Sequence, residues 1–244
     1  MARRQKAIDR YVRDVTIQNV LGCPVQCAFC NVESPRAQKF MATKKFGAAL
    51  EELGKKYDLS DALNVLYSGR GNPIDDPELR MKTELLRSRL GQGGRKLNIT
   101  LAWPLHGGLN NLAERTRGID VLRISLSSEV LRAIRRELKK TAVPSADIED
   151  AVLAEAKWRL RKAADAAAAN GFKPVLLLEG TPGERGQLYR IAEEAFKGSR
   201  IPFGRVETLF SGLEPRGSAL GKSLGRGGIL ILHTGKISKV HPPR

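Results

Sequence analysis

The stretch GCPVQCAFCN, residues 22–31, contains every cysteine of this 244-residue chain, namely Cys23, Cys27 and Cys30. The cysteines have the spacing C-x3-C-x2-C and follow directly on a β-branched run at residues 14–20. Cysteine-ligated iron–sulfur clusters normally take four thiolates. A cluster held by these three would therefore keep one iron open to another ligand.

Two alternatives to an iron–sulfur cluster remain open at this stretch. Structural zinc prefers four ligands, and the fourth would have to come from His106, His233 or His241, none of which has ligand-like spacing. A disulfide framework is disfavoured by the odd number of cysteines and by a reducing setting.

Length and composition indicate one sizeable domain. A hydrophobic content of 41% is enough for a core, and no apolar run approaches the ~18 residues that a membrane span needs. The N-terminus is basic but carries no apolar segment of the kind that a secretory signal contains. We therefore expect a cytoplasmic protein without a membrane partner.

The charge balance is strongly basic. Lys and Arg number 42 against 26 Asp and Glu, which gives a formal net charge of +16. The basic residues gather at 3–13, 39–45, 132–140, 159–162 and 216–226. Such an excess attracts polyanions and predicts RNA or a ribonucleoprotein as partner. A solvated surface of biased composition is the alternative, since no recognition motif accompanies the charge.

Strand and helix patterns alternate about six times along the chain. Strands are predicted at residues 14–21, 62–67, 97–102, 119–126, 173–178 and 203–210. Helices are predicted at residues 44–57, 78–90, 108–117, 129–140, 146–170 and 183–197, with Trp158 on the core face of the longest. This alternation is typical of an α/β fold with a parallel barrel or a doubly wound sheet, and periodicity does not choose between them.

Three segments are expected in the chain. A basic extension covers residues 1–13, and the α/β unit covers residues 14–212. A basic, glycine-rich tail covers residues 213–244 and ends in a small hairpin at 229–233 and 236–240, with Thr234-Gly235 as its turn.

The cysteine spacing, with Phe29 just before the last cysteine, resembles the signature of radical S-adenosylmethionine (SAM) enzymes. The resemblance implies a [4Fe-4S] cluster on Cys23, Cys27 and Cys30, whose open iron chelates the amino and carboxylate groups of SAM. An electron, supplied by a donor such as flavodoxin or ferredoxin, then cleaves the sulfonium and gives a 5'-deoxyadenosyl radical that abstracts hydrogen. It also implies a partial (β/α)6 TIM-like barrel with the cluster loop after the first strand.

A turn after the second predicted strand resembles a second signature of this family. The sequence SGRGNP, residues 68–73, is similar to the Gly-Gly-Glu-Pro turn that receives the methionine amino group. Gly69, Gly71, Asn72 and Pro73 are therefore candidate cofactor-binding residues. Asn72 stands where an acidic residue is expected and brings no charge. Turn chemistry alone is the alternative explanation.

The end of the fourth predicted strand supplies two more candidates. Ser125 and Ser127 resemble positions at which the family contacts the cofactor through Ser or Arg side chains. N-capping of the next helix by Ser127 or Ser128 is the alternative. Trp103 and His106 are candidates for lining the same mouth, with packing as the alternative for the tryptophan.

The order of motifs in residues 64–138 is similar to that of the RNA adenine methyltransferase branch of the family. That branch uses two further cysteines, which this chain lacks, so methyl transfer through cysteine is not inferred. Three function hypotheses remain. They are a radical SAM enzyme acting on RNA or a ribonucleoprotein, the same chemistry on a small molecule or as a glycyl-radical activase, and a non-catalytic RNA- or ribosome-associated protein with a structural Fe-S or zinc site.

Overall fold

The computed structural model describes residues 11–25, 35, 37–107, 109–141, 144–197, 205–209 and 228–240. Cys27, Phe29 and Cys30 lie outside the described residues, as does most of the glycine-rich tail.

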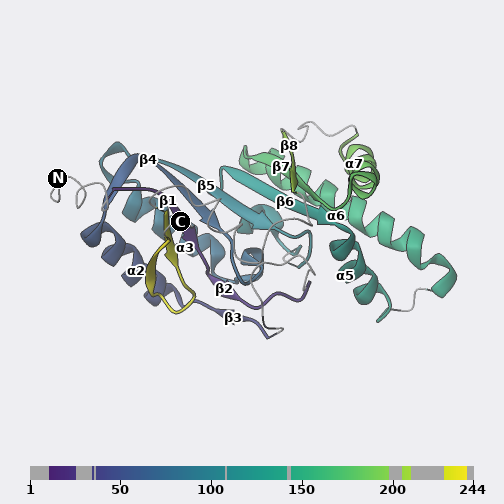
Figure 1. Cartoon of the computed structure of the whole chain (residues 1–244), viewed down its shortest axis with the longest axis horizontal. Coiled ribbons are helices and arrows are strands. Elements are labelled where there is room, and N and C mark those ends of the chain that lie inside the picture. The colour runs from purple at the N-terminus through teal and green to yellow at the C-terminus, as the bar shows by residue number, and fades with distance from the viewer. Residues whose placement is uncertain are drawn as a thin grey trace.

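One eight-stranded sheet organises the fold, in the order β10-β9-β1-β4-β5-β6-β7-β8 (Figure 1). From β1 onward, six parallel strands lie side by side in the order in which they occur in the chain: β1 (Tyr11–Ile17), β4 (Asp58–Tyr67), β5 (Lys96–Trp103), β6 (Val121–Ser127), β7 (Lys173–Glu179) and β8 (Arg205–Leu209). A doubly wound sheet reverses its strand order at a switch point, whereas a barrel adds each strand on the same side. The unbroken order confirms the predicted partial six-stranded barrel.

Helices connect the parallel strands. They are α2 (Thr43–Lys56), α3 (Leu79–Leu90), α4 (Leu112–Arg115), α5 (Ser128–Leu138), α6 (Ile148–Asn170) and α7 (Pro182–Phe196), with 3-10 turns η1 (Pro73–Asp75), η2 (Gln92–Gly94) and η3 (Ser145–Asp147). In Figure 1, α2 and α3 accompany the β1–β4 half of the sheet, and α5 to α7 accompany the β6–β8 half. A capping box of Thr181 and Glu184 begins α7, and left-handed Gly171 ends α6, as its predicted C-cap.

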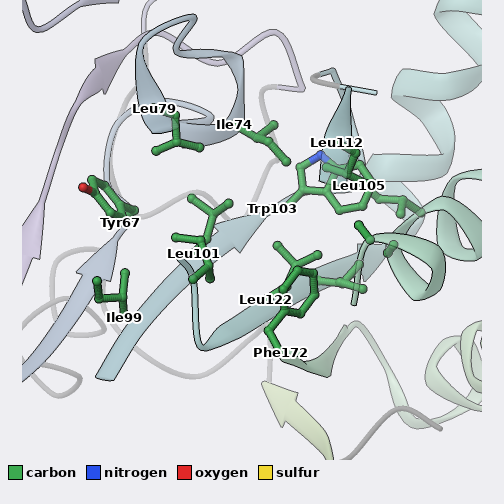
Figure 2. Packing of buried hydrophobic residues seen from close by; sticks show 14 of the residues in the cluster. Tyr67, Ile74, Leu79, Ile99, Leu101, Trp103, Leu105, Leu112, Leu122 and Phe172 are labelled. Atoms are coloured by element: carbon green, nitrogen blue, oxygen red, sulfur yellow. The ribbon is translucent and has the colours of Figure 1, made fainter. Parts of the chain in front are cut away.

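One face of the sheet packs against the helices and forms the core. Side chains alternate between the faces of a strand, and paired residues of neighbouring strands share a face. The core face carries buried apolar residues on each of the first four parallel strands: Val15 and Ile17, Val65 and Tyr67, Leu101 and Trp103, Leu122 and Ile124. Figure 2 shows several of these packed with Ile74, Leu79 and Leu112 from the connecting segments.

The opposite face of the sheet carries a series of polar side chains. Asp14, Asn64 and Asn98 form a row in register across β1, β4 and β5. Asn64 Nδ2 donates to Asp14 Oδ1 at 2.8 Å, and Asn98 Nδ2 donates to Asn64 Oδ1 at 3.3 Å. Further along, this face carries partly exposed Arg123 and Ser125 on β6. A closed barrel fills its interior with branched apolar residues, so this polar inner face is available to a polar ligand.

The C-terminal hairpin differs from expectation in where it lies. Strands β9 (Gly228–Ile231) and β10 (Ile237–Val240) pair antiparallel, as predicted. However, β9 also pairs in parallel with β1, so the hairpin extends the main sheet instead of forming a separate appendage. An unpaired β1 would expose a row of backbone donors and acceptors, and β9 satisfies them. In addition, β1 begins at Tyr11, inside the segment expected to be an extension.

The prediction that Trp158 packs in the core is wrong. Its side chain is 43% exposed, and the Lys162 ammonium lies 5.7 Å from its ring centroid. The buried stripe of α6 runs through Ala156, Leu160 and Ala163. Residue 158 is two positions from both 156 and 160, which places it on the opposite side of a helix with 3.6 residues per turn.

The hairpin's place in the sheet can be tested with Ile231→Ala. Ile231 is fully buried and pairs with Ile17 of β1. We expect the substitution to lower the free energy of unfolding by about 2–4 kcal/mol, because it removes buried methyl groups from the main core. Urea denaturation measures this change. Exposed Ser238 on β10 gives the control, Ser238→Ala; equal stabilities for the two variants would place β9 outside the core.

Candidate functional site

The candidate residues lie at the carboxyl ends of the parallel strands. In register, Ile17 pairs with Tyr67, and Ser127 pairs with Glu179. The loops that follow β1, β4, β5 and β6 therefore leave from the same edge of the sheet. Parallel α/β folds bind their ligands at this edge.

The start of the cysteine loop lies directly against the glycine turn. Gly22 N–H donates to the Arg70 carbonyl at 2.7 Å, and Gly22 forms a parallel bridge with Gly71. Partly buried Cys23 packs against the core, and its N–H donates to the Pro35 carbonyl at 3.1 Å. The two stretches picked out from the sequence are thus neighbours in space.

Helix α5 holds the cysteine loop from another side. It leaves the carboxyl edge after β6, and near its end the Arg136 guanidinium donates to the Val25 carbonyl at 2.9 Å. A residue far along the chain therefore fixes the backbone two positions beyond Cys23.

Glycine is required at two of these positions by the chain's own packing. A Cβ on Gly71 would lie 2.4 Å from the Val20 carbonyl oxygen. A Cβ on Gly22, whose φ is +103°, would lie 2.3 Å from the Ala37 carbonyl oxygen. Real Cβ atoms do not approach backbone so closely, so only glycine lets these segments meet. For Gly71, turn chemistry therefore accounts for the residue without a ligand.

Asn72 and Pro73 are buried at the centre of the site. Asn72 Nδ2 donates to the His106 carbonyl at 2.5 Å, while no described residue donates to its Oδ1. Pro73 begins η1, and its carbonyl accepts from Asn19 Nδ2 at 3.3 Å. Buried acceptors normally have a donor, so Asn72 Oδ1 is a buried acceptor that no described residue satisfies.

A buried ion pair beneath this turn was missed from the sequence. Lys82 Nζ lies 2.7 Å from Asp76 Oδ2, and both side chains are fully buried. The same oxygen accepts from Asn19 Nδ2 at 2.9 Å, and Asp76 Oδ1 accepts from the Glu78 N–H at 3.0 Å. The only signal was that Lys82 falls on the apolar stripe of α3 with Leu79 and Leu86, a position at which a lysine needs a partner.

The two serine candidates differ in their surroundings. Ser127 is fully buried, and its hydroxyl accepts from the Val130 N–H at 3.2 Å, which caps α5. The capping interpretation therefore accounts for Ser127. Ser125 is partly exposed on the polar inner face, where its hydroxyl can meet a ligand.

A cleft of about 520 Å³ adjoins the cysteine loop at Pro24. Its wall contains a charged cluster in which His106 Nε2 donates to Glu137 at 2.9 Å and Arg159 lies 2.7 Å from the same carboxylate. The hydrogen bond from His106, followed by that from Arg159, lowers the pKa of Glu137 to about 2. His106 thus lines this cleft, whereas Trp103 is buried and donates from Nε1 to the His106 carbonyl at 3.0 Å.

Glu179 is a further carboxyl group at this edge that the sequence did not single out. It ends β7 beside Ser127 of β6 and is only 8% exposed. Burial raises its pKa to about 7. A carboxyl group that keeps its proton near neutral pH can donate a hydrogen bond or exchange a proton with a ligand.

The described residues contain no group of His, Cys, Asp and Glu side chains arranged to hold a metal ion. His106 is engaged with Glu137, and His241, like Cys27 and Cys30, lies outside the described ranges. Within the same ranges, none of the helices is both long and apolar enough to span a bilayer.

The close approach at Gly71 can be tested with Gly71→Ala. The added methyl would meet the Val20 carbonyl, so we expect the free energy of unfolding to fall by about 1–3 kcal/mol. Gly54→Ala is the control, since a Cβ there has nothing within 4 Å and replaces a helix-interior glycine, which stabilises by up to about 1 kcal/mol. Urea denaturation of both variants measures the difference. Equal effects would show that the turn tolerates a side chain.

The raised pKa of Glu179 makes stability depend on pH. The folded protein keeps this proton up to about pH 7, whereas the unfolded chain releases it near the ordinary glutamate pKa of 4.5. The free energy of unfolding therefore falls as pH rises through this window, by up to about 3 kcal/mol. We expect Glu179→Gln to remove this part of the fall, so that it is more stable than the unsubstituted protein at about pH 8. Urea denaturation at a series of pH values measures this, and Glu193→Gln, at an exposed position of α7, is the control. An unchanged dependence of the free energy of unfolding on pH in Glu179→Gln would contradict the expectation.

Comparisons with known proteins give only distant likenesses. No protein-family model matches the chain, and no curated protein matches it. Among solved structures, it is similar to anSMEcpe with bound AdoMet and Cp18Cys peptide, at 12% identity and a TM-score of 0.49, over 82% of this chain and 51% of that one. It is also similar to Streptococcus suis SuiB bound to precursor peptide SuiA, at 10% identity and a TM-score of 0.45, over 96% and 61%. The chain spans about half the length of the anSMEcpe chain, and such scores assign it neither an activity nor a substrate.

Proposed function

We propose that this protein is a radical SAM enzyme whose cluster is held by Cys23, Cys27 and Cys30. The observation that carries the proposal is the contact between Gly22 and the glycine turn, which sets Cys23 beside Arg70 and Gly71. The signature resemblance requires these two stretches to meet, although forty-odd residues separate them in sequence. A structural zinc loop has no need of the second stretch.

The residues present fit the cofactor. The turn offers one buried acceptor without a donor, Asn72 Oδ1, and the amino group of SAM is a donor. Gly69, with φ +128°, and Pro73 give the turn its shape, and Ser125 offers a hydroxyl on the inner face. Asn72 would accept a hydrogen bond where a charged carboxylate is expected, so we infer a weaker hold on the amino group than an acidic residue gives.

The cluster on Cys23, Cys27 and Cys30 would supply one electron, received from a flavodoxin- or ferredoxin-like donor, for the reductive cleavage of SAM and the removal of a hydrogen atom from the substrate. The chain's own residues position and shield this chemistry. Arg136 and Gly22 hold the start of the cysteine loop, and the polar inner face would receive the substrate. Glu179 can hold or move a proton at that face.

The substrate is proposed to be RNA or a ribonucleoprotein, which the net charge of +16 supports. Small-molecule chemistry and glycyl-radical activation remain alternatives with the same cofactor. A non-catalytic protein with a structural cluster is a second candidate, because Asn72 is fully buried and its amide is already used by the His106 carbonyl.

Anaerobic reconstitution with iron and sulfide tests the proposal. We expect a brown protein with about four irons per chain that releases 5'-deoxyadenosine when reduced with SAM. Cys23→Ala, Cys27→Ala and Cys30→Ala should each lose both the colour and the product, because no other thiolate can replace the missing ligand.

The other outcomes separate the alternatives. A stable cluster without any 5'-deoxyadenosine would favour the non-catalytic protein. Tight binding of zinc, without uptake of iron, would favour a structural zinc site. The unsubstituted chain carried through the same steps without iron is the control for product formed by the reductant alone.

A further inference from the structure

Four basic side chains from four separate segments meet beside the cysteine loop. Lys39 lies on β3 (Lys39–Phe40), which pairs with β2 (Val20–Leu21) just before Gly22. Arg70 lies in the glycine turn. His233 follows β9, and Lys45 is in the first turn of α2. We call Lys39, Lys45, Arg70 and His233 the rim cluster.

The contacts between these segments bring the rim cluster together. Gln18 N–H, just after β1, donates to the Ile231 carbonyl at 2.8 Å, which places the β9–β10 turn at the exit of β1. In that turn, a Cβ on Gly235 would lie 3.5 Å from the Lys45 carbonyl oxygen. Leu21, the register partner of Lys39, precedes Gly22, which bonds to the Arg70 carbonyl. The cluster therefore stands at the carboxyl edge, next to Cys23.

The charges of the rim cluster reinforce one another. Lys39, Lys45 and Arg70 are exposed. Partial burial lowers the pKa of His233, and so do the positive charges of Lys39, Arg70 and Lys45. Neither Lys39 nor Lys45 forms an ion pair with a carboxylate of the described residues. Two like charges, those of Lys39 and Lys45, therefore stand near each other without a carboxylate partner among the described residues, which favours the binding of an anion.

We propose that the rim cluster is an RNA-docking surface that holds the phosphate backbone of a single strand beside the cysteine loop. The proposal deepens the proposed function by placing its substrate. A strand held there would run past the loop, so that a base can turn toward the polar inner face carrying Ser125. Phosphate contacts position a nucleic acid without reading its sequence, which agrees with a cluster built from lysine and arginine.

RNA is favoured over an acidic protein by the distribution of charge. The chain carries basic clusters along its whole length, and its net charge is +16. An extended polyanion can use several of them at once, because its charges repeat at short intervals. An acidic peptide of ordinary composition presents fewer and less regular charges.

Fluorescence anisotropy with a labelled single-stranded RNA of mixed sequence tests the surface. The variant Lys39→Glu with Lys45→Glu removes two phosphate contacts and reverses their charge. We expect it to weaken binding by at least about tenfold and to lower the magnitude of the slope of log K against log salt by about 1.4. A milder variant, Lys39→Gln with Lys45→Gln, should show the same direction, and circular dichroism checks that each variant folds.

The matched control is Lys96→Glu with Arg117→Glu. These exposed residues stand at the start of β5 and just before β6, at the amino edge of the sheet. Each substitution by Glu lowers the net charge by two, so both double variants carry net +12 instead of +16. We expect the control to weaken RNA binding by less than about threefold.

Several results would overturn the proposal. Equal weakening by the two Glu double variants would mean that total charge alone attracts RNA. Displacement of the RNA by polyglutamate as readily as by unlabelled RNA would point to an acidic protein. If the unsubstituted chain does not bind the RNA, the proposal of an RNA-docking surface is refuted.

The release of 5'-deoxyadenosine without RNA separates this proposal from the proposed function. We expect the reconstituted Lys39→Glu, Lys45→Glu variant to keep that basal reaction while losing RNA. If the chain binds RNA at the rim cluster but cleaves no SAM, the docking surface is supported and the proposed enzyme activity is refuted. If the chain cleaves SAM but the rim-cluster substitutions leave RNA binding unchanged, the enzyme activity is supported and the docking surface is refuted.

Discussion

The carboxyl edge of this sheet depends on a buried pair of opposite charges, Lys82 on α3 and Asp76 just after η1. Burying two ions is costly, and the cost is met only when every remaining lone pair and proton has a partner. Asp76 meets this condition, because its oxygens also accept from Asn19 and from the Glu78 N–H. Removing either partner would leave an uncompensated buried charge, so the turn after β4 has one stable position.

The glycine turn also sets the position of the start of the cysteine loop. Asn19, between β1 and β2, reaches Asp76 and the Pro73 carbonyl with the same amide. Three residues later, Gly22 bonds to Arg70 of the same turn. The start of the cysteine loop is therefore attached to the glycine turn at two points, and one of them, the Asn19 amide, bonds directly to the buried pair. The fold brings two distant sequence stretches together through polar contacts that are too specific to arise from apolar packing alone.

The two faces of the sheet have different roles: one forms the core, and the other can contact a ligand. Apolar residues cover the helix-packed face and supply the core, which leaves the other face polar from Asp14 to Ser125. Among the described residues the sheet runs from β10 to β8 without closing into a ring, which keeps this inner face accessible. Glu179 sits at its carboxyl end, where burial keeps the side chain protonated toward neutral pH. Such a surface suits a hydrophilic substrate with hydrogen-bonding groups.

Local patterns were enough to predict most elements of the fold. Alternation and β-branched runs located the six parallel strands, and Gly171 marked the end of α6. The choice of a barrel over a doubly wound sheet came from the family resemblance, since both share the same local pattern. Three features needed the tertiary structure: β9 joins β1 because a distant edge required a partner, Lys82 is buried because Asp76 faces it, and Trp158 is exposed because the stripe of α6 passes it by. At the site, Cys23 was predicted from the cysteine spacing and Gly69–Pro73 from the resemblance to a family turn. Glu137, Arg159 and Glu179 acquire their character only from neighbours brought close by folding.

Electron–nuclear double resonance of the reduced, reconstituted protein tests whether Cys23, Cys27 and Cys30 hold a cluster whose open iron faces the glycine turn and binds SAM there. With SAM labelled by 15N in its amino group, the account predicts a hyperfine coupling between that nitrogen and the cluster. A spectrum that SAM leaves unchanged would contradict the account, because it would mean that the loop and the turn meet without forming a cofactor site.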